Sequence, residues 1–348
     1  MITLEELSQE LLAGVEQCKQ LPIDLSLMEF FADDDGTMML RRPSDQDALY
    51  YFKADLSSGR DPLVAHAQKQ FCRVVGVPHS YFRKNRPAMR NRMVRGWQQS
   101  LETDSPSAVR LLKYRKSSEC NVVRALVGRD HTDLRNHQVV ESVMGTPDIP
   151  VDLHLVSGED MDSLVFHFRV LVGDPFEIEG DRVRMGAAFT CSELGASEFI
   201  VDSYVHHLES DVSFFGTYGS APYFVSRYES IREDELRNTL PSFIKSIAEQ
   251  YSTYKETIEA LDGFQGVQES CRIVGGNKKC SPALRRAIYQ EASEYSEDMR
   301  SFWDFARHVS LVGHDLDTQK RIKAELVAGT FLNLVFERTE RSMQSNGS

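Results

Sequence analysis

The strongest constraint on the fold is a change in the spacing of apolar residues near residue 230. From Ala108 to Tyr228, short segments alternate apolar and polar residues, a pattern typical of β-strands. After Glu233, apolar residues recur every three or four positions, which is typical of amphipathic helices. The predicted strands are 109–116, 121–127, 151–156, 163–172, 182–190, 198–208 and 223–228, and the turn Ser117–Glu119 is expected to join the first two in a hairpin. The later helices fall in 240–251, 281–309 and 317–337. Strands and helices are therefore segregated along the chain.

The N-terminal part of the chain has a mixed pattern. Residues 5–20 predict an amphipathic helix that Pro22 ends, and short strands are expected at 28–31 and 38–40. Asp33–Gly36 lies between these strands, and its contiguous aspartates favour a solvated turn over a cation site. Three short helices follow between residues 61 and 104, in an order similar to a helix-turn-helix, and simple packing of three helices is favoured over insertion into a DNA groove.

These patterns predict an α+β fold with a largely antiparallel or mixed central sheet, an N-terminal basic helical unit and a helical C-terminal third. We expect an N-terminal helix with short strands in residues 1–60 and a C-terminal helical region in 263–348. Between them, 61–262 forms the core domain, with the basic helical unit at 61–104 and the sheet at 105–230. Residues 263–279 are expected to be a flexible connection that includes the glycine-rich Gly275–Lys279.

Composition restricts the location and the cofactors. The apolar runs are too short to span a bilayer, and the chain starts with acidic residues where a secretory signal needs basic ones, so we expect a cytoplasmic protein with no membrane partner. The six cysteines contain no CxxC pair, which disfavours a zinc ribbon or a disulfide framework. We predict no cofactor and no bound metal.

The clearest functional signal is the local charge. Residues 69–135 carry 15 Lys/Arg against 5 Asp/Glu, within a protein of net charge −12. A focused basic segment in an acidic protein can track a phosphate backbone, and neighbouring aromatic rings such as Tyr81 and Trp97 can stack on bases. The predicted nucleic-acid-binding residues are Arg83, Lys84, Arg86, Arg90, Arg92, Arg95, Lys113, Tyr114, Arg115 and Lys116. The alternative is that these cations pair with acidic residues, within one subunit or across an oligomer interface.

Two turns are candidate ligand sites. The first contains Arg129, Asp130 and His131, which suit acid–base work or a turn held by ion pairs. The second contains Ser192 and Glu193 between two predicted strands. These residues either line a ligand pocket or stabilise a β-turn through hydrogen bonds to its backbone. We favour the structural interpretation for both turns.

A histidine pair presents a third possibility. His206 and His207 are adjacent on a predicted strand, so their side chains point to opposite faces and cannot share one metal ion. Glu209 and Asp211 fall on the same face as His207 in a strand pattern, which makes a His/carboxylate cluster conceivable. A network of hydrogen bonds is the favoured interpretation.

Three stretches resemble a family of phages and plasmids, the phage/plasmid-like domain of unknown function 932. They are Phe71–Pro78 with Ser80–Phe82, then Val123–Leu134, and finally Val183–Gly195 continuing to Tyr204. The resemblance spans about residues 60–260 and rests on the order and spacing of the stretches. It implies a bacteriophage or plasmid origin, a bacterial host cytoplasm and a link to the processing of mobile-element DNA, but no known activity.

We therefore expect a non-enzymatic, mobile-element-encoded protein that binds nucleic acid and self-associates as a homo-oligomer. Single-stranded DNA in replication or recombination is the favoured ligand. The competing hypothesis is a protein-interaction module that counters or remodels a host bacterial system through its acidic surface. A hydrolase built on Asp130/His131 or Ser192/Glu193 has the least support.

Overall fold

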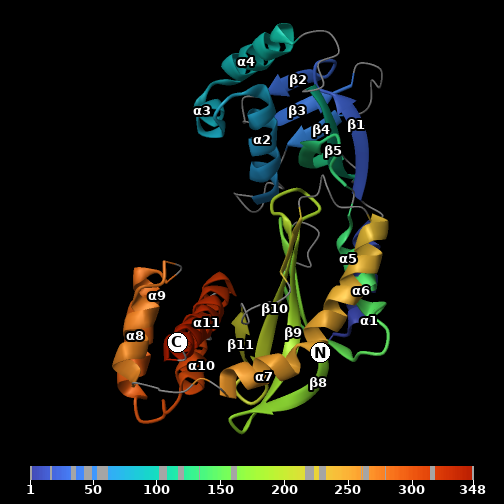
Figure 1. The fold of residues 1–348 in the computed structure, drawn as a ribbon. Coiled ribbons are helices and arrows are strands. Elements are labelled where there is room, and N and C mark those ends of the chain that lie inside the picture. The colour runs from blue at the N-terminus through green and yellow to red at the C-terminus, as the bar shows by residue number, and fades with distance from the viewer. Residues whose placement is uncertain are drawn as a thin grey trace.

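The computed structural model has two lobes, an upper one and a lower one in Figure 1. Each lobe has its own sheet and its own hydrophobic core. The structure describes residues 2–15, 18–32, 37–42, 49–52, 62–101, 108–116, 121–132, 134–157, 163–215, 223–226, 233–259, 261, 266–278, 280–313 and 318–346. The turns predicted at Asp33–Gly36 and Ser117–Glu119 lie outside these residues.

The upper lobe is a mixed sheet covered by three helices. Its strands, in the order β1-β5-β6-β4-β3-β2 across the sheet, are β1 (Cys18–Asp24), β2 (Glu29–Ala32), β3 (Met38–Arg41), β4 (Leu49–Phe52), β5 (Val109–Lys116) and β6 (Asn121–Gly128). β4 and β6 are parallel, and the other neighbours are antiparallel. The helices are α2 (Pro62–Val75), α3 (His79–Lys84) and α4 (Pro87–Ser100). Phe71 of α2 and Phe82 of α3 pack on Phe30 of β2, which fixes these helices to the sheet.

The lower lobe is built on an antiparallel sheet of longer strands. They are β7 (Val151–Ser157), β8 (Phe166–Ile178), β9 (Asp181–Cys191), β10 (Phe199–His207) and β11 (Val212–Phe215), in the order β11-β10-β9-β8-β7, with β12 (Tyr223–Ser226) also paired to β10. The pairing of β7 with β8 shifts between Leu153 and Leu155, so His154 occupies a β-bulge.

Helices cover the lower sheet from both sides (Figure 1). On one side lie α1 (Leu4–Val15), α5 (Asn136–Met144), α6 (Glu233–Glu249) and α7 (Tyr251–Glu259); on the other lie α8 (Val267–Gly275), α9 (Pro282–Glu294), α10 (Phe302–Leu311) and α11 (Thr318–Asn346). Helix α11 packs directly on β11, because Gly329 leaves room for the backbone of Phe215. Among the described helices, none has the length and apolarity needed to cross a bilayer.

The predicted α+β class, with a helical C-terminal third, is confirmed. The predicted strands, however, divide between two sheets. β5 and β6 pair with each other as predicted, and their other neighbours are β1 and β4, respectively. They therefore belong to the same sheet as the N-terminal strands, and the strands after residue 151 form the other sheet. The domain boundaries predicted after residues 60 and 262 remain predictions.

Two predicted segments differ in the structure. The helix expected over 5–20 ends at Val15, and residues 18–24 form β1, which the helical period concealed. Pro22 is tolerated there because β1 is an edge strand. The connection expected at 263–279 contains α8, whose apolar residues Ile273 and Val274 are buried in the lower core.

Candidate functional site

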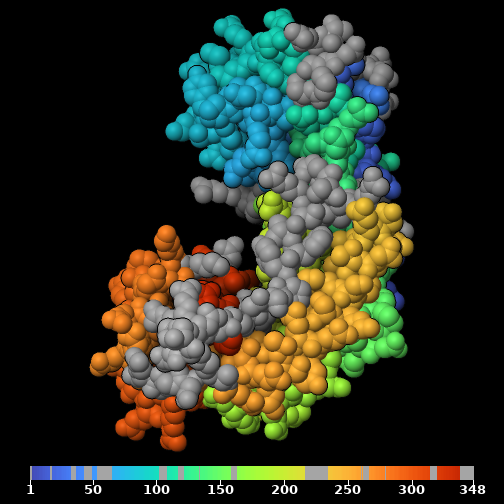
Figure 2. All heavy atoms as spheres, viewed as in Figure 1, coloured from blue at the N-terminus to red at the C-terminus, as the bar shows by residue number. Residues whose placement is uncertain are grey.

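Helices α3 and α4 carry a surface of five exposed cations, which we call the basic face: Arg83, Lys84, Arg86, Arg92 and Arg95. The segment 79–100 contains no Asp or Glu. Helix α4 buries Val94 against the sheet. Arg92 and Arg95 are three residues apart, nearly one helical turn, so both lie on the same side of α4 and are exposed to solvent. These helices form part of the outer surface of the upper lobe (Figure 2).

None of the five cations of the basic face forms an ion pair with any carboxylate among the described residues. The prediction that they neutralise acidic side chains of the same subunit therefore finds no support in the part of the chain described. Two large apolar side chains lie exposed on the same helices, Tyr81 at 55% and Met89 at 41% of their full surface. Exposed cations and an exposed aromatic ring thus occur on the same pair of helices.

Arg90 does not join the basic face. It is only 8% exposed, and its guanidinium donates hydrogen bonds to the carbonyls of Phe82, Arg83 and Asn85 at 2.7–3.2 Å. These carbonyls are at the C-terminus of α3, where helix carbonyls lack partners within the helix. Arg90 therefore fixes α3 to α4, and its assignment to nucleic-acid binding is corrected.

The basic residues of β5 lie apart from the basic face. α4 contacts β2, whereas β5 is four positions from β2 in the sheet order. Lys113 is 4% exposed and donates from Nζ to the Glu193 carbonyl at 2.7 Å, so it joins the two lobes rather than facing a ligand. Tyr114 packs edge-on against Tyr50 in the core, Arg115 is half-buried and Lys116 is exposed. Of the predicted aromatic partners, Trp97 also packs against the upper core.

The two predicted ligand turns, far apart in the sequence, meet at the junction of the lobes. Gly195 has φ +66°, and a Cβ at this position would be 3.5 Å from Cε1 of His131. A cavity of about 530 Å³ lies here, lined by Gly195, Arg129, Asp130 and His131 together with Arg73 and Arg110 among others. Arg129 and Asp130 are exposed, whereas His131 is buried.

Ser192 and Glu193 have structural contacts. The Ser192 hydroxyl donates to the Leu164 carbonyl at 2.7 Å and accepts from the Ala196 amide at 2.9 Å, which is the shaped turn that the sequence favours. Glu193 Oε1 accepts the Asn136 amide at 2.8 Å, and Glu193 Oε2 lies 3.9 Å from the Arg124 guanidinium. Helix α5 begins at Asn136, and two side chains cap it: Glu193, on the turn after β9 of the same lobe, and Gln138, whose Oε1 accepts the Arg135 amide at 2.8 Å.

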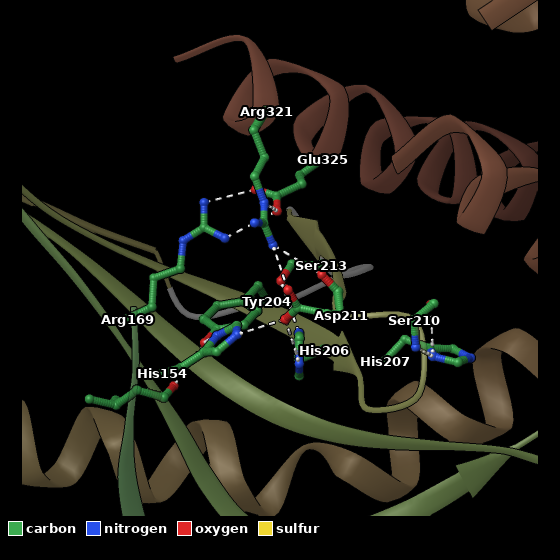
Figure 3. A network of polar contacts seen from close by, with 11 residues as sticks. His154, Arg169, Tyr204, His206, His207, Ser210, Asp211, Ser213, Arg321 and Glu325 are labelled. Atoms are coloured by element: carbon green, nitrogen blue, oxygen red, sulfur yellow. Dashed lines mark hydrogen bonds and ion pairs between the residues drawn. The ribbon is translucent and has the colours of Figure 1, made fainter. Parts of the chain in front are cut away.

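His206 and His207 of β10 belong to a network of polar contacts (Figure 3), and their partners differ from those predicted from the sequence. His206, not His207, faces Asp211, with 3.6 Å between His206 Nε2 and Asp211 Oδ1. His207 lies 3.0 Å from Asp181 and 3.6 Å from Glu209. The strand alternation that placed Asp211 with His207 does not continue through the turn after β10, where Asp211 has φ +53°.

His154 is the member of this network that the sequence did not reveal. Its Nε2 lies 3.4 Å from Asp211 Oδ1, and its ring centroid is 4.1 Å from that of His206. Burial lowers the pKa of His154 and lowers the pKa of His206 to about 3. No spacing motif could identify His154, because it comes from β7, at the far edge of the sheet from β11.

Comparison with known protein families, with curated proteins and with solved structures finds no match to this chain.

Proposed function

We propose that this chain is a mobile-element-encoded protein that binds single-stranded DNA through the basic face, without catalysing a reaction, in the cytoplasm of a bacterial host. The observation that carries the proposal is the set of five exposed cations on α3 and α4 that form no ion pair among the described residues. Exposed cations attract phosphate most strongly when no carboxylate is paired with them, and no such pair exists among the described residues.

The distribution of charge between the lobes supports the same surface. Residues 18–135, which include the whole upper sheet, carry 20 Lys/Arg and 14 Asp/Glu, whereas the rest of the chain carries 20 Lys/Arg and 38 Asp/Glu. A polyanion is therefore attracted to the upper lobe and repelled by the lower one. A homo-oligomer that places several basic faces side by side would strengthen this attraction, and we include self-association in the proposal.

The preference for a single strand rests on Tyr81. Its exposed ring lies on α3, the helix that carries Arg83 and Lys84, so an unpaired base could stack on it while the cations contact phosphates. Stacking of this kind tolerates any base, so we expect affinity without sequence readout. A duplex hides its base faces and would use the cations alone.

The test compares charge variants in fluorescence anisotropy with a labelled single strand and a duplex of equal length at about 50 and about 200 mM salt. Arg92→Gln/Arg95→Gln should weaken binding and reduce the slope of log affinity against log salt by about 1.4, since each phosphate contact on a single strand contributes about 0.7. Tyr81→Ala should weaken binding to the single strand more than to the duplex. The matched control is Arg286→Gln/Arg300→Gln, which removes two exposed arginines of the lower lobe.

Equal affinity of the two double variants would overturn the assignment of the basic face. Absence of salt-sensitive binding by the unaltered protein at low salt would overturn the function, and capture of a host protein would then be the hypothesis to pursue. The molar mass from light scattering tests self-association separately.

A further inference from the structure

Three ligand-type atoms converge between the lower sheet and α11, outside the basic face: Nε2 of His154, Nε2 of His206 and Oδ1 of Asp211. All three lie within 4.8 Å of one another. They come from β7, from β10 and from the turn before β11. Imidazole nitrogen and carboxylate oxygen in this ratio are a common donor set for first-row transition metals.

Both rings are held by their other nitrogen. His154 Nδ1 lies 2.9 Å from the Tyr204 hydroxyl, and His206 Nδ1 lies 3.3 Å from the Ser213 hydroxyl. Hydrogen bonds at the second nitrogen orient metal-binding imidazoles and fix their tautomer. The cluster thus has the outer layer of contacts that metal sites require.

The hydrogen bonds of Tyr204 accommodate the tautomer of His154 that binds a metal through Nε2. In the tautomer with its proton on Nδ1, His154 donates to the Tyr204 oxygen at 2.9 Å while Tyr204 donates its own proton to the Val170 carbonyl at 3.2 Å. Neutral His154 then has a lone pair on Nε2, and this lone pair faces the carboxylate oxygen of Asp211 at 3.4 Å. A metal ion between these two atoms would be bound by both, whereas without an ion a proton on Nε2 completes a hydrogen bond to Asp211.

The backbone also positions these groups. His154 is the extra residue of the β7 bulge, and bulges redirect single side chains near functional sites. Arg321 donates to the Asp211 carbonyl at 3.0 Å and lies 3.5 Å from Oδ2, which leaves Oδ1 turned toward the histidines. The side chain of Asp211 is 60% exposed, so an ion can reach the cluster from solvent.

We propose that His154, His206 and Asp211 bind a divalent transition-metal ion of the zinc type. Zinc ligands at about 2.0–2.1 Å in a tetrahedron lie about 3.3–3.4 Å from one another. The observed distances from Asp211 Oδ1 to the two Nε2 atoms, 3.4 and 3.6 Å, are close to such tetrahedral edges. Three protein ligands leave one position for water or an anion.

The experiment is a titration of the tag-free full chain with Zn²⁺ in a calorimeter, together with the visible absorption of Co²⁺ added in place of zinc. The unaltered protein should bind one ion, and Asp211→Asn should abolish that binding while leaving the circular dichroism spectrum unchanged. Tyr204→Phe removes no ligand atom but removes the bond to His154 Nδ1, and it should weaken zinc binding about 10–100-fold. His167→Ala is the control, because His167 lies on β8 of the same sheet and bonds Thr190 instead.

Failure of the unaltered protein to bind zinc at micromolar concentrations would overturn the proposal. Equal binding by the unaltered protein and Asp211→Asn would also overturn it, because the ion would then be held elsewhere. The proposal would also be overturned if His167→Ala changed the Co²⁺ spectrum and Asp211→Asn left it unchanged. None of these results depends on nucleic-acid binding.

Discussion

The ring of Tyr204 lies flat over Gly186 on the neighbouring strand. A Cβ added to Gly186 would be 2.8 Å from Cε2 of Tyr204 and closer still to Cζ and Cε1. Gly186 is therefore the reason that Tyr204 can extend from β10 across β9 to the Val170 carbonyl on β8 and to His154 on β7. One missing side chain allows one tyrosine to connect four strands.

Gly186→Ala should destabilise the protein by about 1–3 kcal/mol, because the buried ring has to move for the methyl group to fit. Urea unfolding measures this change. Gly128→Ala is the control, since a Cβ at Gly128 meets no atom within 4 Å. Equal unfolding free energies for the two variants would show that the ring moves without cost.

A buried ion pair joins the lower sheet to α11. Arg169 of β8 donates two hydrogen bonds to Glu325, at 2.8 and 3.2 Å, and both side chains are nearly inaccessible. Removing one partner leaves an unpaired buried charge, so Glu325→Leu should lower the unfolding free energy by about 3–5 kcal/mol. Arg169→Met/Glu325→Leu removes both charges and should recover much of this loss.

Urea unfolding of the four proteins of this cycle gives the coupling energy directly. Arg321 complicates the cycle because it also lies 3.2 Å from Glu325. A double variant as unstable as Glu325→Leu alone would mean that the packing of α11, and not the unpaired Arg169, accounts for the loss.

Glu193 should contribute to the attachment of the two lobes. Glu193→Gln keeps the size of the side chain but removes the charge that pairs with Arg124 and that lies at the N-terminus of α5. We expect a loss of about 3 kcal/mol in unfolding free energy, since Arg124 is buried. Glu141→Gln, an exposed change on α5, should have little effect. A loss equal to that of the Glu141 variant would show that the pair contributes nothing.

Acid should lower the folding stability through His66, which lies on α2 beside the turn at Leu194. Burial lowers the pKa of His66, whose Nε2 lies 3.1 Å from the Leu194 carbonyl. The unfolded chain binds this proton at about pH 6.5, whereas the folded chain resists it, so folding stability falls as pH decreases below about 6.5. His66→Gln should reduce that dependence between about pH 7 and about pH 5, measured by urea unfolding. An unchanged slope would exclude His66 as a contributor.

The fold class followed from local patterns, whereas the pairing of the strands did not. Alternation identified β5 and β6 correctly as a hairpin, but period alone carries no information on whether β6 pairs next with β4 or with a later strand. Likewise, the apolar residues near the end of 5–20 are compatible with a helix or with an edge strand. Only their pairing with β5 shows that residues 18–24 form a strand.

The candidate sites divide in the same way. Exposed cations such as Arg92 and Arg95 follow from charge and helical period, which are local properties. Arg90 and Lys113 have the same charge but are buried by contacts with residues of other segments, which the sequence does not display. His154 was inaccessible to prediction because a bulge and a distant strand bring it to His206.

The connections between the lobes give the upper lobe the character of an insertion. The chain leaves the lower lobe after α1 and returns at α5, and these two helices pack against each other. Val15 at the end of α1 and Asn136 at the start of α5 line the same small cavity, so the entry and exit of the upper lobe are neighbours. A segment with adjacent ends can be gained, lost or exchanged as a unit without interrupting the core of its host. Recombination between genes could thus replace the whole basic face while leaving the histidine cluster and its helices intact.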